Sequence, residues 1–202
     1  TTKPTVLLQG ESGSGKTALM AKLSSLLKAR NNRVVHVFVG NSPNLTKGKY
    51  MAKVLAAQLS GCDAQQKDYT PADLYQVLSK ASPSQPTYIF IDSLDSLQQG
   101  DLFRQMAWMP EDLHSNVHIL CSQIPSSGIA SYAYATRFDI PKLSDTDVSS
   151  IVQSDLAQIK RCITPEQQKT VDQMLKMGDH TPLYAKLLSY MAMQLRSDDY
   201  IQ

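Results

Sequence analysis

Residues 10–17 read Gly-Glu-Ser-Gly-Ser-Gly-Lys-Thr, the most specific motif in the chain. It fits the pattern G-x-x-x-x-G-K-[ST], in which glycines let the backbone turn so that successive N–H groups point at phosphate oxygens. The apolar run at 6–8 precedes the stretch, and leucines at helical spacing over 16–29 follow it. A strand that feeds such a loop and then a helix N-terminus suits the binding of phosphates. The sequence therefore predicts a nucleoside triphosphate site.

Each part of this loop has a predicted contact. The Lys16 ammonium is a mobile cation for the β- and γ-phosphates, and the Thr17 hydroxyl is a hard oxygen ligand for Mg²⁺. The predicted cofactor-binding residues of the loop are Gly10, Ser12, Gly13, Ser14, Gly15, Lys16, Thr17 and Ala18.

Two acidic residues follow a second apolar strand. The run YIFI at 88–91 ends on Asp92, and ligands of open α/β sheets bind at the carboxyl ends of the strands. Asp92 is therefore predicted to hold magnesium, through water, from the side opposite Thr17. Asp95 is a candidate to orient the attacking water, with a solvated turn or helix cap as the alternative. Lys16, Asp92 and Asp95 are the predicted catalytic residues.

Strand and helix patterns alternate along most of the chain. Further strands are expected at 34–39, 117–121 and 137–140, and helices at 45–59 and from 71 to 78. Alternation of this kind implies a parallel sheet with helices on both faces, a three-layer α/β domain. After about residue 141 only helical patterns remain, at 144–159, from 164 and from 181, with Gly178 expected to end the second helix. The predicted domains are 1–142 and 143–202.

Composition bears on the partners and the cellular compartment of the protein. The net charge of +2 over 202 residues argues against a nucleic-acid partner, and no apolar run reaches the roughly 20 residues that a membrane helix needs. The widely spaced Cys62, Cys121 and Cys162 indicate reduced thiols and a cytoplasmic protein, and the four histidines show no metal-ligand spacing. The start at Thr1, without Met, leads us to expect a segment of a longer polypeptide.

The chain resembles the NACHT-type signalling ATPases, the STAND class of P-loop ATPases, and most of all the nephrocystin and telomerase-associated-protein group. The resemblance is carried by residues 7–19 (LLQGESGSGKTAL), 37–59 (VFVGNSPNLTKGKYMAKVLAAQL), 89–97 (IFIDSLDSL) and 108–125 (WMPEDLHSNVHILCSQIP). It implies an AAA+-like (ASCE) core followed by a helical lid that closes over ATP or ADP with Mg²⁺. It also implies signal transduction by nucleotide-controlled self-association, with slow hydrolysis of the β–γ bond.

The resemblance also implies that Pro182, in Thr181-Pro182-Leu183, packs beside the base. Its position alone favours an ordinary helix-start proline.

The chain departs from the family pattern in the residues after the fourth strand, where the family commonly has an arginine. Here the stretch reads CSQIP at 121–125, so Ser122 or Gln123 could hydrogen-bond phosphate or water but neither neutralises charge. Efficient hydrolysis is therefore not expected.

The same residues bear on other P-loop functions. A P-loop kinase is the alternative, but its arginine-rich lid is not evident, because Arg161 and Arg196 do not cluster. A GTPase would need an Asn/Thr-Lys-x-Asp tetrapeptide, which the sequence lacks, so adenine preference rests on elimination and resemblance. Arg104 and Arg137 could act in a neighbouring subunit, but surface or salt-bridged arginines are expected.

Overall fold

The computed structural model describes residues 4–60 and 68–195, and its centre is a five-stranded sheet in the order β2-β3-β4-β1-β5. All four strand pairings are parallel, so every carboxyl end lies at the same edge. The strands are β1 (Thr5–Gln9), β2 (Arg33–Phe38), β3 (Thr87–Asp92), β4 (Val117–Gln123) and β5 (Thr136–Asp139). The predicted strand at 137–140 is thus confirmed with a shift of one residue.

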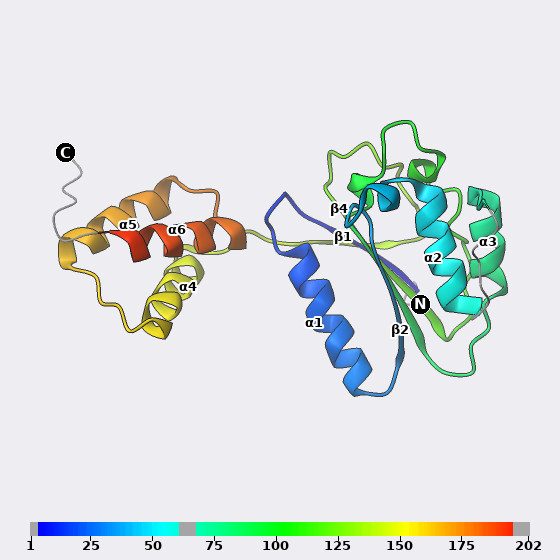
Figure 1. Cartoon of the computed structure of the whole chain (residues 1–202), viewed down its shortest axis with the longest axis horizontal. Coiled ribbons are helices and arrows are strands. Elements are labelled where there is room, and N and C mark those ends of the chain that lie inside the picture. The colour runs from blue at the N-terminus through cyan, green and yellow to red at the C-terminus, as the bar shows by residue number, and fades with distance from the viewer. Residues whose placement is uncertain (1–3, 61–67, 196–202) are drawn as a thin grey trace. The chain divides into compact units, whose positions relative to one another are not determined.

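Helices cover both faces of this sheet, as Figure 1 shows for α1 (Lys16–Ala29) on one side and α2 (Gly48–Ser60) and α3 (Pro71–Lys80) on the other. Strand β3 shows why, because its side chains alternate between two clusters. Ile89 and Ile91 pack with residues of α2 and α3, whereas Phe90 packs with Met20 of α1. The predicted three-layer α/β class is therefore confirmed.

The helix expected over 45–59 begins later than its pattern suggested. Pro43–Thr46 form a short 3-10 helix, and Lys47 is extended before α2 starts at Gly48. The Gly48 N–H donates to the carboxylate of Asp101 at 2.7 Å, and a Cβ at Gly48 would lie 2.3 Å from the Phe103 ring. A contact from a distant segment fixes this helix start, which local spacing could not reveal.

The remaining helices are α4 (Asp145–Gln158), α5 (Pro165–Met177) and α6 (Pro182–Gln194). Capping boxes begin α4 at Ser144 and α5 at Thr164, and Thr181 caps α6. The apolar faces of the three helices share one core, in which Val148, Val152, Ala185 and Leu188 are buried.

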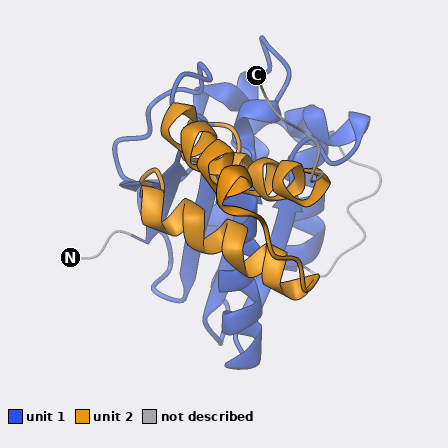
Figure 2. Cartoon of the chain, turned by 90° about the vertical axis from the view of Figure 1, so that its left-hand side faces the viewer, with its two compact units in different colours: residues 1–11, 16–140 blue, residues 12–15, 141–202 orange. Residues whose placement is uncertain are grey.

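Contacts divide the chain into two compact units, coloured separately in Figure 2. One contains residues 1–11 and 16–140, which we call the sheet unit, and the other contains 12–15 and 141–202, which we call the helical unit. The tip of the phosphate loop therefore groups with the helices. The functional domain boundary at 142/143 stays a prediction.

Gly178 follows α5 as expected, but it is not a left-handed glycine cap. Its φ is −89°, outside the left-handed region of a glycine cap, and the left-handed residue is His180 with φ 49°. A Cβ at Gly178 would lie 2.0 Å from the Tyr184 ring. Glycine is therefore needed here because an aromatic ring covers the backbone.

The structure also bears on the cysteines and on the expected absence of a membrane helix. Cys121 and Cys162 are free thiols, burial raises the pKa of Cys121 to about 12, and Cys62 lies outside the described residues. Across residues 4–60 and 68–195, the helices are all too short or too polar to cross a membrane.

Candidate functional site

The loop between β1 and α1 has the conformation that its glycines allow. Gly13 and Gly15 have φ values of +78° and +89°, which residues other than glycine rarely adopt. Lys16, the first residue of α1, is 9% exposed, and its Nζ donates to the carbonyl oxygens of Gly10 at 2.7 Å and Glu11 at 2.9 Å. The lysine cation is therefore held against the start of the loop by backbone dipoles.

The tip of the loop contacts the first turn of α6 inside the helical unit. The Leu183 N–H donates to the Gly13 carbonyl oxygen at 3.2 Å, and a Cβ at Gly13 would lie 2.8 Å from the Leu183 Cβ. A Cβ at Gly15 would lie 3.5 Å from Pro182. Pro182 is thus both the helix-start proline and a neighbour of the loop, while its contact with a base stays a prediction.

Asp92 ends β3 at the carboxyl edge of the sheet and is 2% exposed. The Ser122 hydroxyl, on the adjacent strand β4, accepts the Ser93 N–H at 2.8 Å and donates to Asp92 Oδ1. The direction is unambiguous, since a backbone N–H can only donate and an ionised carboxylate can only accept. Ser122 is therefore engaged by the carboxylate, which removes it as a free phosphate ligand.

Asp95 lies in the short helix Leu94–Ser96 that follows β3. Its Oδ1 accepts the N–H of Ile124 at 3.1 Å, so the carboxylate joins this helix to the segment after β4. Asp95 is half-buried, which argues against the solvated turn. The contact is not a helix cap, because Ile124 directly follows strand β4, and the role of Asp95 in orienting water stays a prediction.

Arg104 joins the segment that follows β3 to the segment that follows β4. Its side chain is 4% exposed, and the guanidinium donates to the carbonyl oxygens of Leu97 at 2.6 Å, Asp95 at 3.3 Å and Ser127. The expectation of a surface or salt-bridged arginine was wrong for this residue, because the side chain is buried and its guanidinium donates to backbone carbonyl oxygens. Arg137 is exposed on β5 and bonds Ser131.

Gln123 completes the carboxyl end of β4, next to Gln9 of β1 in the strand register. It is 4% exposed, and its Oε1 has no hydrogen-bond partner among the described residues. Ser14, on the loop, likewise has a buried hydroxyl oxygen without a partner in that part of the chain. Buried polar atoms of this kind are expected where a polar ligand binds.

The structure thus places the predicted residues in two groups. Asp92, Asp95 and Gln123 share one edge of the sheet unit, while Thr17 and Ala18 are exposed in the first turn of α1 and Ser12 is exposed on the loop. The positive-φ glycines, the carbonyl-held Lys16 and the partnerless Ser14 hydroxyl fit a triphosphate. Thr17 and Asp92 are hard-oxygen donors that fit magnesium. Sequence reasoning missed the roles of Ser122 and Arg104, because the Ser122 partners lie at the end of the neighbouring strand and the Arg104 partners lie on two separate loops.

Solved structures resemble this fold across nearly the whole chain. A Drosophila ORC structure bound to DNA has a TM-score of 0.59 at 19% identity, covering 95% of this chain and 50% of that one. The FIGL-1 AAA domain in complex with ADP gives 0.57 at 17% identity, covering 95% and 61%. DnaA bound to AMPPCP and single-stranded DNA gives 0.57 at 10% identity, covering 96% and 56%. The chain spans between half and two thirds of the length of these structures.

Fold and loop together define a P-loop NTPase with AAA+ neighbours. More narrowly, the model of the NACHT domain family matches residues 4–158, and the chain belongs to this family. The NACHT identification from sequence is confirmed; the nephrocystin and telomerase-associated-protein subgroup stays a prediction. No curated protein matches the chain in sequence.

Proposed function

We propose that this chain is the nucleotide switch of a signalling ATPase, which binds ATP or ADP with magnesium and changes its assembly accordingly. The observation that carries the proposal is the contact between α6 and the phosphate loop, in which the Leu183 N–H bonds the Gly13 carbonyl oxygen at 3.2 Å. A helix whose first turn rests on the loop responds to any ligand that changes the loop. Binding of nucleotide to the loop would then change the conformation of the helical unit.

The binding roles follow from the residues already described. Loop N–H groups and the Lys16 ammonium would bind the phosphates, and Pro182 would lie beside the base. Thr17 and Asp92 would hold Mg²⁺, Asp92 through water. Bound magnesium supplies charge neutralisation at the β- and γ-phosphate oxygens.

Slow hydrolysis is the second part of the proposal. The carboxyl end of β4 offers Ser122 and Gln123, of which the first already bonds Asp92. The Arg104 guanidinium bonds carbonyl oxygens of the adjacent loops instead of facing a ligand. Asp95 would orient water, but no cation from these segments would balance the charge that develops during transfer. Such a module suits a switch better than a rapid catalyst.

Calorimetric titration with ATP, ADP and GTP, each with magnesium, tests the proposal. Micromolar binding of adenine nucleotides, weak binding of GTP, and loss of binding in Lys16→Ala are expected. Lys22→Ala is the matched control, since Lys22 is exposed on the same helix and should bind as the parent does. Absence of binding by the folded parent chain would contradict the proposal.

Self-association and partners form the last part. We infer that the module associates with copies of itself in a nucleotide-dependent manner, in the cytoplasm, and that nucleic acid is not its partner, given the net charge of +2. Sedimentation velocity with ADP and with a non-hydrolysable ATP analogue tests the association. A single monomeric species in both states, or tight binding of DNA, would contradict this part.

A further inference from the structure

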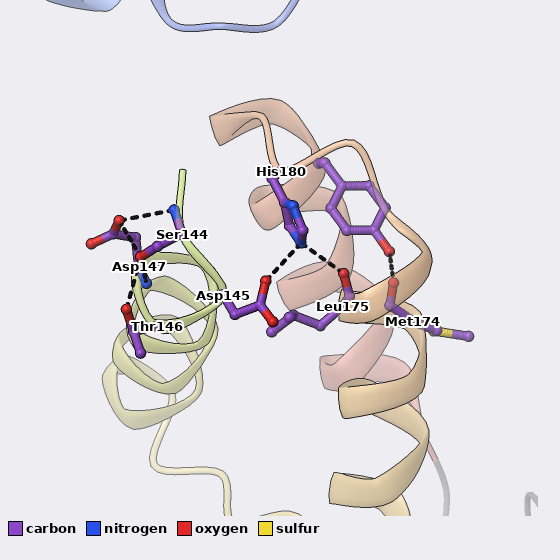
Figure 3. A network of polar contacts seen from close by, with 8 residues as sticks. Ser144, Asp145, Thr146, Asp147, Met174, Leu175 and His180 are labelled. Atoms are coloured by element: carbon purple, nitrogen blue, oxygen red, sulfur yellow. Dashed lines mark hydrogen bonds and ion pairs between the residues drawn. The ribbon is translucent and has the colours of Figure 1, made fainter. Parts of the chain in front are cut away.

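His180 joins α4 and α5 through one ring nitrogen. Its Nε2 lies 2.9 Å from the carbonyl oxygen of Leu175, in the last turn of α5, and 3.1 Å from Oδ1 of Asp145, the first residue of α4 (Figure 3). Both neighbours are acceptors, so Nε2 carries a proton that lies between them. The ring therefore ties the end of one helix to the beginning of another.

The backbone of His180 is constrained as well. Its φ of 49° lies in the left-handed region, which residues other than glycine rarely adopt unless their surroundings fix them there. Its carbonyl oxygen accepts the N–H of Leu143 at 2.9 Å, from the segment that enters the helical unit. Ring and backbone together hold this one residue against α4, α5 and the entering segment.

The residues directly after His180 reach the phosphate loop. The Thr181 hydroxyl accepts the Tyr184 N–H at 3.1 Å and so caps α6, and the Leu183 N–H donates to the Gly13 carbonyl oxygen at 3.2 Å. All these contacts lie inside the helical unit. His180 is thus the last residue tied to α4 and α5 before the turn that contacts Gly13.

We propose that His180 is a positioning residue for the nucleotide site, acting through the first turn of α6 and touching no nucleotide itself. Its two contacts, together with the bond from the Tyr184 hydroxyl to the Met174 carbonyl oxygen, hold that turn where the Leu183 N–H meets Gly13. When the two His180 contacts are lost, the turn samples other positions and the loop is less often in its binding conformation, which weakens binding. The inference rests on the proposed function, because it assumes that the loop binds nucleotide.

Three variants separate positioning from general stability. His180→Ala removes both contacts, whereas His180→Gln keeps a terminal NH₂ that can donate to both acceptors. Both variants bear the same left-handed backbone, so their difference isolates the side-chain contacts. Thr164→Ala removes the cap of α5, which destabilises the same unit without touching the start of α6.

The first measurement is the Kd of ADP by calorimetry. We expect His180→Ala to raise the Kd about fivefold or more, the lower end of typical coupling between sites. His180→Gln should restore most of the affinity, and Thr164→Ala should lose thermal stability with its Kd unchanged. Equal losses of affinity in His180→Ala and Thr164→Ala, or in the Ala and Gln variants, would overturn the proposal.

Hydrogen exchange of the nucleotide-free chain gives an independent reading. A peptide covering residues 181–186 should exchange faster in His180→Ala than in the parent chain, and as in the parent in Thr164→Ala. Unchanged exchange in His180→Ala would overturn the positioning role whatever the affinities are. If the parent chain binds no nucleotide, the proposed function fails, and faster exchange in His180→Ala would still support the role in holding α6.

Discussion

The Ser122 hydroxyl on β4 donates its proton to the Asp92 carboxylate at the end of β3, and the same oxygen accepts the N–H of Ser93. The serine thus orients the Asp92 carboxylate toward the neighbouring strand. It also satisfies one acceptor of a carboxylate that is 2% exposed. Removing the partner of a buried polar group costs more free energy than the hydrogen bond contributes. The remaining group is then left with neither a protein partner nor water.

Ser122→Ala should therefore lower the free energy of unfolding by about 1–3 kcal/mol, measured by urea denaturation. Ser150→Ala is a suitable control, because Ser150 is exposed and bonds the Thr146 carbonyl within its own helix. If Asp92 holds magnesium, the variant should also need more magnesium for nucleotide binding. A cost for Ser122→Ala no larger than that for Ser150→Ala would contradict the assigned bond.

The sequence predicted those parts of the site that depend on neighbouring residues along the chain. The loop at 10–17 and the acid at the end of β3 follow from local spacing and from the rule that ligands bind at carboxyl ends of strands. The bond between Ser122 and Asp92 depends on strand order, since β4 comes after β3 in the chain and lies beside it in the sheet. Arg104 escaped prediction for a similar reason, because its carbonyl acceptors lie on two separate segments.

The contact of α6 with the loop tip shows the same limit. The sequence marked Thr181-Pro182 as a helix start from its cap and proline, and that start is confirmed. Nothing in the spacing indicated that Leu183 would bond Gly13, about 170 residues away in the chain. Gly178 ends α5 as the sequence predicts, but the ring that requires glycine there belongs to Tyr184 of the next helix, which local spacing does not reveal.

Replacement of Arg104 should destabilise the loops that carry Asp95. Arg104→Met would leave three carbonyl oxygens without their donors, and we expect a loss of about 2–4 kcal/mol in the free energy of unfolding. Arg104→Lys should recover only part of this loss, since an ammonium cannot reproduce the fork of the guanidinium. Urea denaturation checks both values.

Arg137→Met is the matched control for Arg104, because Arg137 is exposed on β5. Its expected change lies within about 0.5 kcal/mol, as for most surface substitutions. Similar small changes at positions 104 and 137 would show that the buried guanidinium contributes little.

Gly178→Ala should destabilise the helical unit by about 1–3 kcal/mol through steric conflict. Its Cβ would lie 2.0 Å from a ring atom of Tyr184, whose hydroxyl bonds the Met174 carbonyl oxygen. In the double variant with Tyr184→Ala, the glycine substitution should cost much less, and a double-mutant cycle measures that coupling. Additive costs would exclude the ring as the reason for glycine.

Gly100→Ala provides the contrast to Gly178→Ala. A Cβ at Gly100 would meet no atom of the described residues within 4 Å, but its φ is +81°. The expected cost of about 1 kcal/mol then comes from backbone conformation alone. No partner substitution should relieve it.

His36 makes the stability of the sheet unit depend on pH. Its ring stacks on Phe38 with centroids 4.4 Å apart, and its Nε2 is buried without a hydrogen-bond partner among the described residues. Burial lowers the pKa of His36 below the usual 6.5, the nearby Lys28 lowers it further, and Asp92 opposes them. The unfolded chain therefore takes up this proton at a higher pH than the folded chain does.

It follows that the contribution of His36 is fully present above pH 6.5 and is lost as the pH falls through the lowered pKa of the folded state. His36→Phe keeps a ring against Phe38 and cannot be protonated. Urea denaturation between about pH 5 and 8 should show the variant gaining stability relative to the parent chain as the pH falls through that range. An NMR titration of the His36 ring checks the cause directly: a folded-state pKa at or above 6.5 would contradict this explanation, even if the two stability curves diverged.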